Sequence, residues 1–397
     1  MTDLPVLDLG PDPFERGVVQ GRTLAASIRA NLETYFNRFA MVGSDRATVL
    51  AAAGRWQAFI AEDNADYAIE MAGIAKGAGL SLDEITVLNA RYELTYEVYS
   101  IEARRAKGDG AQAAPDPQDM PEQEGCTLFG LMPDVTASGA CVIGQNWDWL
   151  AGLAGNCFIK RVHRDEQPEL GKPAFVGFSE AGIVGCKMGV NQAGVGLCIA
   201  GLVTAFEGQG AMRKPVHVRC AEILDAWRFS EALRPVLQTD RTCSSNFMIG
   251  HGDGEIIDIE ATTGHAAYLY PQDGVVTHSN NLVAERRVAS QIERIAPSTL
   301  FRAERVRRHM KAQSGRIDLD VIRAVMSDHF SAPASVCMHA DPKLPAARRN
   351  ATIASVAIDL TNKVLYATNG NPCHNPFRPY PLAPATAPAD AMEMASA

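Results

Sequence analysis

The Gly125-Cys126 dipeptide combines residue types and a position that suit chemistry. It lies between a segment rich in acidic residues and proline, 107–124, and an apolar run that begins CTLFGL. A cysteine there can attack the carbonyl carbon of its own preceding peptide bond, and a glycine before it lets the backbone twist. Hydrolysis of the thioester would leave Cys126 with a free α-amine, which suits a general base for its own thiol. The alternative is a buried structural cysteine at the start of a strand.

Asp148 and Asn246 are two further candidates for such a site. Asp148 lies in QNWDW, at the end of the strand expected to pair with the Cys126 strand, so a hairpin would place its carboxylate beside the new α-amine. Asn246 begins the apolar run NFMIGH, and a side-chain amide suits an oxyanion hole. The alternatives are an aspartate that forms a turn and an asparagine that closes one.

Neither a cofactor nor a metal is expected from the motifs. The nine cysteines are scattered, and no Cys/His spacing typical of a metal site or phosphate-binding glycine motif occurs. His278, His329 and His339 fall near the ends of predicted elements and are interpreted as structural. The basic run from Arg302 to Lys311 fits a solvated helix face better than a site for an anionic group.

The amino-acid composition and net charge argue against some classes of binding partner. The 397 residues carry a net charge of −9, which argues against nucleic acid and anionic membrane surfaces as partners. No apolar run is long enough to span a bilayer, and the N-terminus lacks a secretory signal pattern. We therefore expect a cytoplasmic protein with a small-molecule substrate, and homo-oligomers remain open.

The hydrophobic pattern predicts helices first and strands later. Apolar residues recur at helical spacing through 14–80, and Ser81 with Glu84 forms a capping-box pattern before a further helix. After Cys126, short strand-like runs alternate with turns, interrupted by helical segments near 216–237 and 299–327. This order predicts an α+β fold in which two sheets pack face to face with helices outside. The Pro/Ala-rich tail, from about 381, is predicted to be disordered.

The motifs together resemble a known family. EGCTLFG followed by IGQNWDW, with LNARYEL upstream, resembles the acyl-coenzyme A:6-aminopenicillanic acid acyltransferase family, the C45 group of N-terminal nucleophile hydrolases. GFSEAGIVGCKMGVNQAGVGL, THSNN, SDHF, SVCMH and TNGNPCHNPF follow in family order, so the resemblance covers most of the chain. It implies a four-layer αββα sandwich of two antiparallel sheets.

The resemblance also implies residue roles and an activation step. Cys126 would be the nucleophile exposed by self-cleavage after Gly125, Asp148 would lie near its amine, and Asn246 would support the oxyanion. An α chain of 1–125 and a β chain of 126–397 would remain associated. Two positions depart from the pattern: Met338 stands where many relatives have arginine, and Asn281 where they often have histidine.

Three functions are consistent with this resemblance. We expect a self-activated amidohydrolase that acts on linear amides, such as N-acyl amino acids or acyl amines, through a thioester on Cys126. An N-acyltransferase that uses acyl-coenzyme A is the first alternative, because the two reactions share one acyl-enzyme. A catalytically silent binding scaffold is the second, motivated by Met338 and Asn281.

Overall fold

Two β-sheets pack against each other in the computed structural model, which describes residues 3–41, 43–95, 125–164, 171–208 and 211–383. One sheet has eight strands in the order β1-β4-β5-β6-β7-β8-β9-β10, and the other has six in the order β11-β2-β3-β12-β13-β14. The strands of the eight-stranded sheet are β1 Val6–Leu9, β4 Cys157–Val162, β5 Phe175–Glu180, β6 Met188–Asn191, β7 Val195–Gly201, β8 Ser245–His251, β9 Glu255–Ala261 and β10 Ala266–Leu269. Those of the six-stranded sheet are β2 Thr127–Leu131, β3 Val142–Leu150, β11 Val275–His278, β12 Asn350–Asp359, β13 Val364–Ala367 and β14 Arg378–Pro381.

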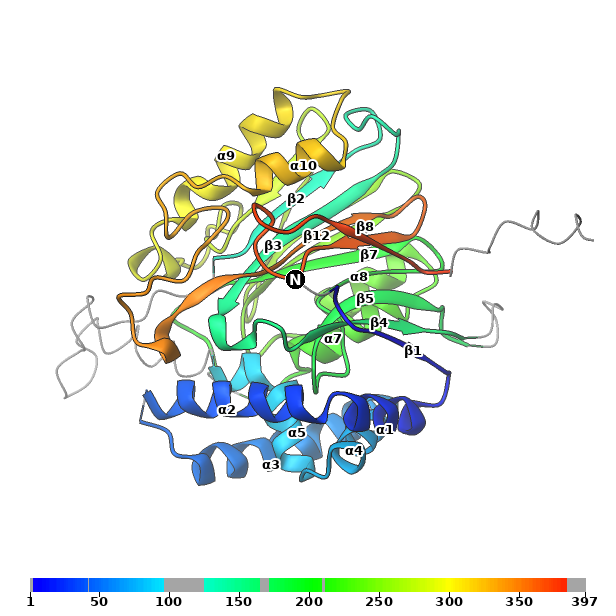
Figure 1. The fold of residues 1–397 in the computed structure, drawn as a ribbon, viewed down its shortest axis with the longest axis vertical. Helices are drawn as coiled ribbons and strands as arrows, with labels where there is room; N and C mark the ends of the chain where they lie inside the picture. The colour runs from blue at the N-terminus through cyan, green and yellow to red at the C-terminus, as the bar shows by residue number, and fades with distance from the viewer. Residues whose placement is uncertain (1–2, 42, 96–124, 165–170, 209–210, 384–397) are drawn as a thin grey trace, which may run out of the picture.

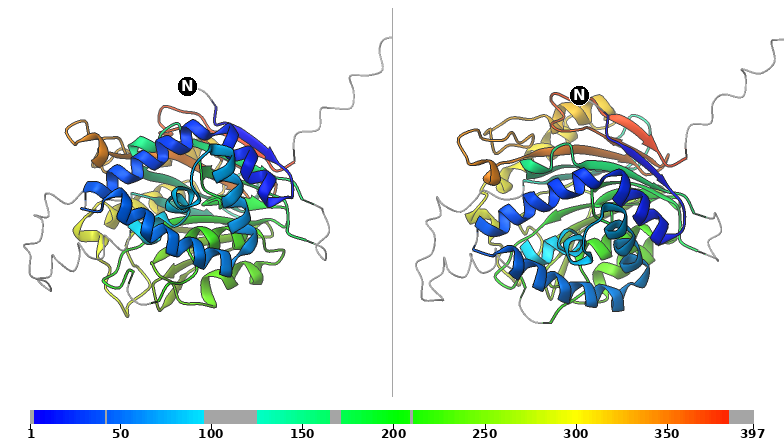
Figure 2. Two further views of the ribbon diagram at one scale, coloured as in Figure 1. Left: turned by 90° about the horizontal axis from the view of Figure 1, so that it is seen from below. Right: turned by 60° about the horizontal axis from the view of Figure 1, so that its bottom comes forward.

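Helices cover both outer faces, so the molecule has four layers, αββα (Figure 1). The N-terminal helices and the pair α7 and α8 lie on the side of the eight-stranded sheet, while α9 and α10 cover the six-stranded sheet. Views from below show the N-terminal helices lying over the strands (Figure 2). The helices are α1 Pro13–Thr23, α2 Ala25–Met41, α3 Arg46–Asp63, α4 Ala65–Ala78, α5 Leu82–Asn89, α7 Val216–Leu224, α8 Phe229–Leu237, α9 Thr299–Lys311 and α10 Leu319–Met326, with 3₁₀ turns at Ala151–Leu153, Ile292–Arg294 and Ala346–Arg348.

Local sequence signals explain where the N-terminal helices begin and end. The side chains of Asp12, Asp45 and Asn64 accept backbone N–H groups at the starts of α1, α3 and α4. Ser81 and Glu84 form the predicted capping box at the start of α5. Helix α4 ends at Ala78 and is capped by Gly79, whose φ of 61° is left-handed and favours glycine.

The predicted order of helices and strands is confirmed, with three corrections. Strands β1 and β14 were not predicted, and β1 pairs with β4 in parallel, so the eight-stranded sheet is not wholly antiparallel. The helix predicted to run on from Ser81 ends at Asn89, and residues 91–95, the last described before the gap, are helical again. The segment 107–124 and the tail beyond 383 lie outside the described residues.

Buried ion pairs join the N-terminal helices to the eight-stranded sheet. Arg91 donates from Nη2 to Glu180 Oε1 at 2.7 Å, and Lys160 of β4 pairs with Glu70 of α4. All four side chains are at most 2% exposed. Because a buried charge is costly without its partner, these pairs hold segments 3–95 and 125–383 together independently of the peptide link between them. No helix among the described residues has the length and apolarity to cross a membrane.

Candidate active site

The β2–β3 hairpin brings Cys126 and Asp148 together, as the sequence predicted. Thr127 pairs with Asn146, so Cys126 at the start of β2 lies beside the end of β3. Its Sγ is 4.0 Å from the backbone oxygen of Asp148, and its side chain is only 2% exposed. The hairpin therefore places a thiol and a carboxylate at one end of the six-stranded sheet.

One oxygen of the Asp148 carboxylate is held and the other is not. Thr352 donates from Oγ1 to Asp148 Oδ1 at 2.6 Å, while Oδ2 is buried without a hydrogen-bond partner in the described structure. Thr352 lies where the β3–β12 register shifts, and such bulges often re-aim side chains beside sites. Burial raises the pKa of Asp148 to about 7, although Arg302 and Thr352 lower it. The group can therefore accept or donate a proton near neutral pH.

Gly125 packs against the side chains of Met338 and Asp148. A Cβ at this position would lie 2.4 Å from Met338 Cε and 2.8 Å from Asp148 Oδ2. A side chain at this position would clash at such distances. Glycine is therefore favoured by the lack of room for a Cβ as well as by its backbone freedom. The same distances place the unpaired Asp148 oxygen beside the Gly125-Cys126 peptide.

Arg302 is the functional candidate that sequence reasoning missed. Its side chain is fully buried, and Nη1 donates to the carbonyl oxygens of Gly125 and Cys126, the latter at 2.6 Å. Nη1 also reaches Thr127 Oγ1, and Nη2 donates to Asn280 Oδ1, both at 2.9 Å. A guanidinium on the Gly125 carbonyl can stabilise negative charge that develops on that oxygen.

A signal for Arg302 exists in its helix. The residues Arg302, Val306 and Met310 recur at four-residue spacing and are all buried on α9. A charged residue on the apolar face of an amphipathic helix must find buried partners, whereas the remaining basic residues of the run are on other faces. The prediction of a solvated basic face therefore holds for those residues and is wrong for Arg302.

Asn246 lies in the facing sheet, on β8. Its Nδ2 donates to Asp258 Oδ1 at 2.6 Å, and its Oδ1 is buried without a partner in the described residues. An amide nitrogen carries two N–H groups, so the bond to Asp258 fixes its orientation and leaves the second N–H to donate elsewhere.

Met338 and Asn281 have packing and hydrogen-bonding roles. Met338 is buried against Gly125, in the place where the family pattern would put an arginine. Asn281 accepts a hydrogen bond from Thr299 Oγ1 at 2.9 Å, at the start of α9. Since Arg302 brings a guanidinium to the site from α9, the loss of the patterned arginine does not leave the site without a cation.

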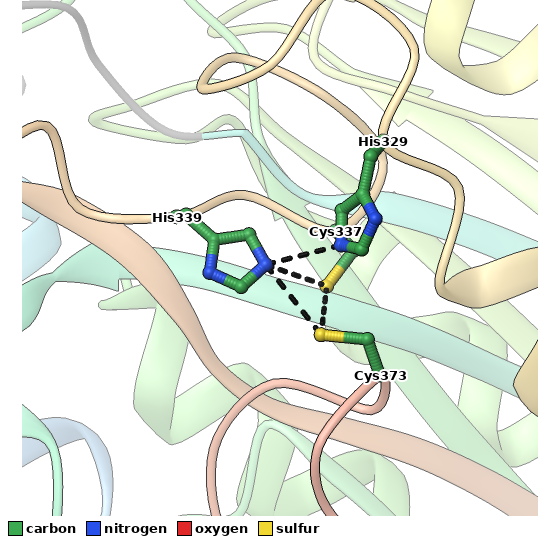
Figure 3. Close-up of side chains that lie close together, drawn as sticks. All are labelled: His329, Cys337, His339 and Cys373. Carbon is green, nitrogen blue, oxygen red and sulfur yellow. Dashed lines mark hydrogen bonds between the residues drawn. The ribbon is translucent and has the colours of Figure 1, made fainter.

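The three histidines that the sequence suggested were structural have different surroundings. His278 is buried between Glu260, 2.9 Å from its Nε2, and the backbone oxygen of Ser279. His329 and His339 instead meet Cys337 and Cys373 in one cluster of possible metal ligands (Figure 3). No such cluster was expected from the sequence, because the spacing of these residues follows no standard metal-binding motif.

Comparison with known proteins identifies the family. A model of the acyl-coenzyme A:6-aminopenicillanic acid acyl-transferase family matches residues 135–374, more than half of the chain. This chain belongs to that family. The match includes Asp148 and Asn246 and begins just after the β2 strand that follows Cys126.

Individual relatives of this acyl-transferase family member are distant. The 40 kDa form of acyl-coenzyme A:6-aminopenicillanic-acid-acyltransferase from Emericella nidulans is 25% identical over 272 residues, and the alignment spans 68% of this chain and 66% of that protein. Among solved structures, a variant of the conjugated bile acid hydrolase from Clostridium perfringens is 15% identical, with a TM-score of 0.45, over 64% of this chain and 96% of that one. Penicillin V acylase from Agrobacterium tumefaciens is 16% identical, with a TM-score of 0.41, over 61% of this chain and 82% of that one.

Proposed function

We propose that this protein is a self-activating N-terminal cysteine amidohydrolase. It cuts its own chain between Gly125 and Cys126, and Cys126 then attacks linear amides to form a thioester that water hydrolyses. The observation that carries this proposal is that a guanidinium and a carboxylate both lie beside the Gly125-Cys126 peptide bond. The Arg302 guanidinium donates to the Gly125 carbonyl oxygen, and the unpartnered oxygen of Asp148 lies beside Gly125.

Self-cleavage begins with attack of the Cys126 sulfur on the Gly125 carbonyl carbon. The thiol proton passes to Asp148, whose pKa of about 7 suits a group that first accepts and then donates a proton. Arg302 stabilises the oxyanion on the Gly125 oxygen. Cleavage of the C–N bond returns the proton to the departing Cys126 nitrogen and leaves a thioester. Water then attacks the thioester, which gives a Gly125 carboxylate and a Cys126 with free amine and thiol.

The same residues serve turnover of an external amide. The new α-amine of Cys126 is the base for its thiol, and the free Asp148 oxygen accepts a hydrogen bond from that amine and orients it. Asn246, oriented by Asp258, supports the oxyanion of the acyl intermediate. Arg302 remains fixed by Thr127 and Asn280 after the bond is cut. The two chains stay associated through the buried pairs between segments 3–95 and 125–383.

Self-cleavage is tested on a denaturing gel with N-terminal sequencing. Wild-type protein should give two chains, of which the larger begins at Cys126, and Cys126→Ala should stay as one chain. Cys141→Ala, at a second buried cysteine outside the site, is the matched control and should be cut normally. A wild-type chain that stays intact after long incubation would instead favour the silent binding scaffold.

Acyl transfer from coenzyme A is the second candidate, and the family match is the observation that favours it. The basic run on α9 gives little support for coenzyme A binding, because its cationic side chains already form ion pairs with carboxylates. Arg305 meets Asp328, Arg307 and Arg308 meet Glu304, and Lys311 meets Asp273. The pairs that face solvent are weak, yet they lower the positive potential available to a phosphate.

Partition of the acyl-enzyme decides between hydrolysis and transfer. The enzyme is acylated with an acyl-thioester or with an N-acyl amino acid, and the products formed with water and with added amines are measured. We expect free acid to predominate, since transfer requires an acceptor pocket that excludes water. Faster acylation by the thioester, with amide as the main product at modest amine concentration, would establish the transferase instead.

A further inference from the structure

Four possible metal ligands converge from two loops that adjoin strands of the six-stranded sheet. His329, Cys337 and His339 come from the segment between α10 and β12, and Cys373 from the segment between β13 and β14. Figure 3 shows the two imidazoles and two sulfurs pointing toward one another. Their four ligand atoms all lie within 4.8 Å of one another.

Four of the six distances between the ligand atoms are close to the edges of a tetrahedron around a metal ion. The two Sγ atoms are 3.6 Å apart, and His339 Nε2 lies 3.7 Å from Cys337 Sγ and 3.5 Å from Cys373 Sγ. The Nε2 atoms of His329 and His339 are 3.1 Å apart. Tetrahedral zinc, with Zn–S near 2.3 Å and Zn–N of 2.0–2.1 Å, requires edges of about 3.3–3.8 Å. A small adjustment of the two imidazoles is enough to admit the ion.

Hydrogen bonds around Cys337 fix the ligand loops. Asn371 Nδ2 lies 3.4 Å from Cys337 Sγ and also donates to the backbone oxygen of Met338 at 2.7 Å. Ser335 donates from Oγ to the Cys337 oxygen at 2.6 Å. Hydrogen bonds of this kind orient metal ligands and tune their basicity. Cys337 is fully buried, whereas His329 is exposed, so the cluster extends from the interior to the surface.

We propose that His329, Cys337, His339 and Cys373 bind one Zn²⁺ ion as a closed structural site. Two thiolates and two imidazoles are a set that zinc prefers, and four protein ligands leave no position for substrate. The two cysteine thiols give up their protons to solvent as the ion binds, so affinity falls at low pH. All four ligands follow Cys126 in sequence, so the site forms in both the intact and the cut protein.

The ion would stabilise one wall of the proposed cleavage site. Met338 lies between the ligands Cys337 and His339, and its Cε contacts Gly125. Its backbone N–H donates to Thr352 Oγ1 at 2.9 Å, and Thr352 in turn holds Asp148. This effect on positioning rests on the proposed self-cleavage, whereas zinc binding itself does not.

Metal content of the full-length protein tests the site directly. Wild-type protein and Cys126→Ala are expressed with zinc, freed of any metal-binding tag and gel-filtered without chelator, and then analysed by elemental mass spectrometry. We expect one Zn²⁺ per chain in both. Replacement of zinc by Co²⁺ should give the intense visible bands of a tetrahedral site, with thiolate-to-metal charge transfer. Cys373→Ser and His339→Ala should lose the metal, while His309→Ala, at an exposed histidine outside the cluster, should keep it.

Two outcomes would overturn the zinc proposal. Wild-type protein that leaves gel filtration without zinc, after incubation with excess Zn²⁺ under reducing conditions, lacks the site. A Cys337–Cys373 disulfide, seen as an intact mass lower by two hydrogens together with zinc-free protein, would assign the pair to redox chemistry. Both measurements use wild-type protein, so they do not depend on whether a variant folds. Zinc in an uncut Cys126→Ala chain separates this proposal from self-cleavage.

Discussion

Two buried carboxylates, Glu180 and Asp148, have opposite electrostatic environments in one molecule. Arg91 and Lys187 both contact Glu180 Oε1, and Tyr35 donates to Oε2 at 2.7 Å. Burial alone would raise its pKa, but the two cations lower it to about 2. Asp148 has a single hydroxyl partner on one oxygen and none on the other, and burial raises its pKa to about 7.

The difference in environment distinguishes a carboxylate with a structural role, Glu180, from one that can transfer protons, Asp148. A carboxylate with partners on both oxygens and two cations beside it stays ionised and joins elements, as Glu180 joins helix residues Tyr35 and Arg91 to the sheet. A buried carboxylate with an unused oxygen and a pKa near neutrality is costly for stability and suits proton transfer. The following changes test whether the two groups keep these separate roles.

Asp148→Asn should have the largest effect on processing. The amide keeps the shape of the side chain but cannot take the Cys126 proton. We expect cleavage to slow by about 10²–10⁴-fold, the usual contribution of a positioned acid–base group, with the fold unchanged. The cut fraction is followed over time on denaturing gels, and circular dichroism checks the fold. Normal processing would remove Asp148 from the mechanism.

Glu180→Gln should act on stability instead. It leaves Arg91 and Lys187 buried without their counter-charge, and loss of one partner of a buried ion pair costs about 3–5 kcal/mol. Urea unfolding of the Cys126→Ala precursor measures the change. Glu304→Gln, at an exposed pair on α9, is the control, and a surface change of this type should stay within about 0.5 kcal/mol. If the Glu180→Gln protein is stable but fails to cut itself, Glu180 acts in processing and its assignment to a structural role is wrong.

Arg302→Gln should slow self-cleavage by about 10²–10³-fold, the cost of losing one oxyanion donor. Arg308→Gln, on the exposed face of the same helix, should be cut at the wild-type rate. Arg302→Lys keeps the charge but not the planar fork that reaches several acceptors, so partial recovery is expected. Equal processing by Arg302→Gln and Arg308→Gln would show that the guanidinium contact is structural only.

The pH dependence of precursor stability should reflect Asp148. The folded pKa is about 7 and the ordinary value is 3.8, so the folded state keeps a proton that the unfolded state releases. The contribution of this group is full below pH 3.8 and is lost as pH rises through 7, at about 1.4 kcal/mol per pH unit between these values. Comparison of Cys126→Ala with Cys126→Ala/Asp148→Asn by urea unfolding isolates it. Identical pH slopes would contradict the raised pKa.

Local patterns were sufficient to predict the part of the site that lies on one hairpin. Cys126 and Asp148 are on neighbouring antiparallel strands, so alternation and a turn place them together before any tertiary structure is known. The order of strands and outer helices followed from periodicity in the same way. The parallel β1–β4 pair was missed because its partners are about 150 residues apart and β1 has only four residues.

Tertiary packing decided the remaining contacts. The spacing of Arg302 with Val306 and Met310 marks it as the buried arginine of the basic run, but only the packing of α9 on β2 and β11 shows that it reaches the Gly125-Cys126 peptide. His329, Cys337, His339 and Cys373 come from two loops whose proximity depends on the β12–β13 hairpin and the end of α10. No residue spacing along the chain encodes that proximity, so motif searches for metal ligands do not find it.

Strand β1 has a consequence for a chain cut after Gly125. Val6–Leu9 pairs with Ile159–Val162 and completes one edge of the eight-stranded sheet, so in the cut protein a separate polypeptide covers that edge. Folding and unfolding of the uncut precursor are both unimolecular. Refolding of the cut protein is bimolecular, because two chains must meet. Its apparent melting temperature should rise with protein concentration, while that of Cys126→Ala should not. Dilution should therefore favour separation of the two chains, which leaves β4 as an uncovered edge strand.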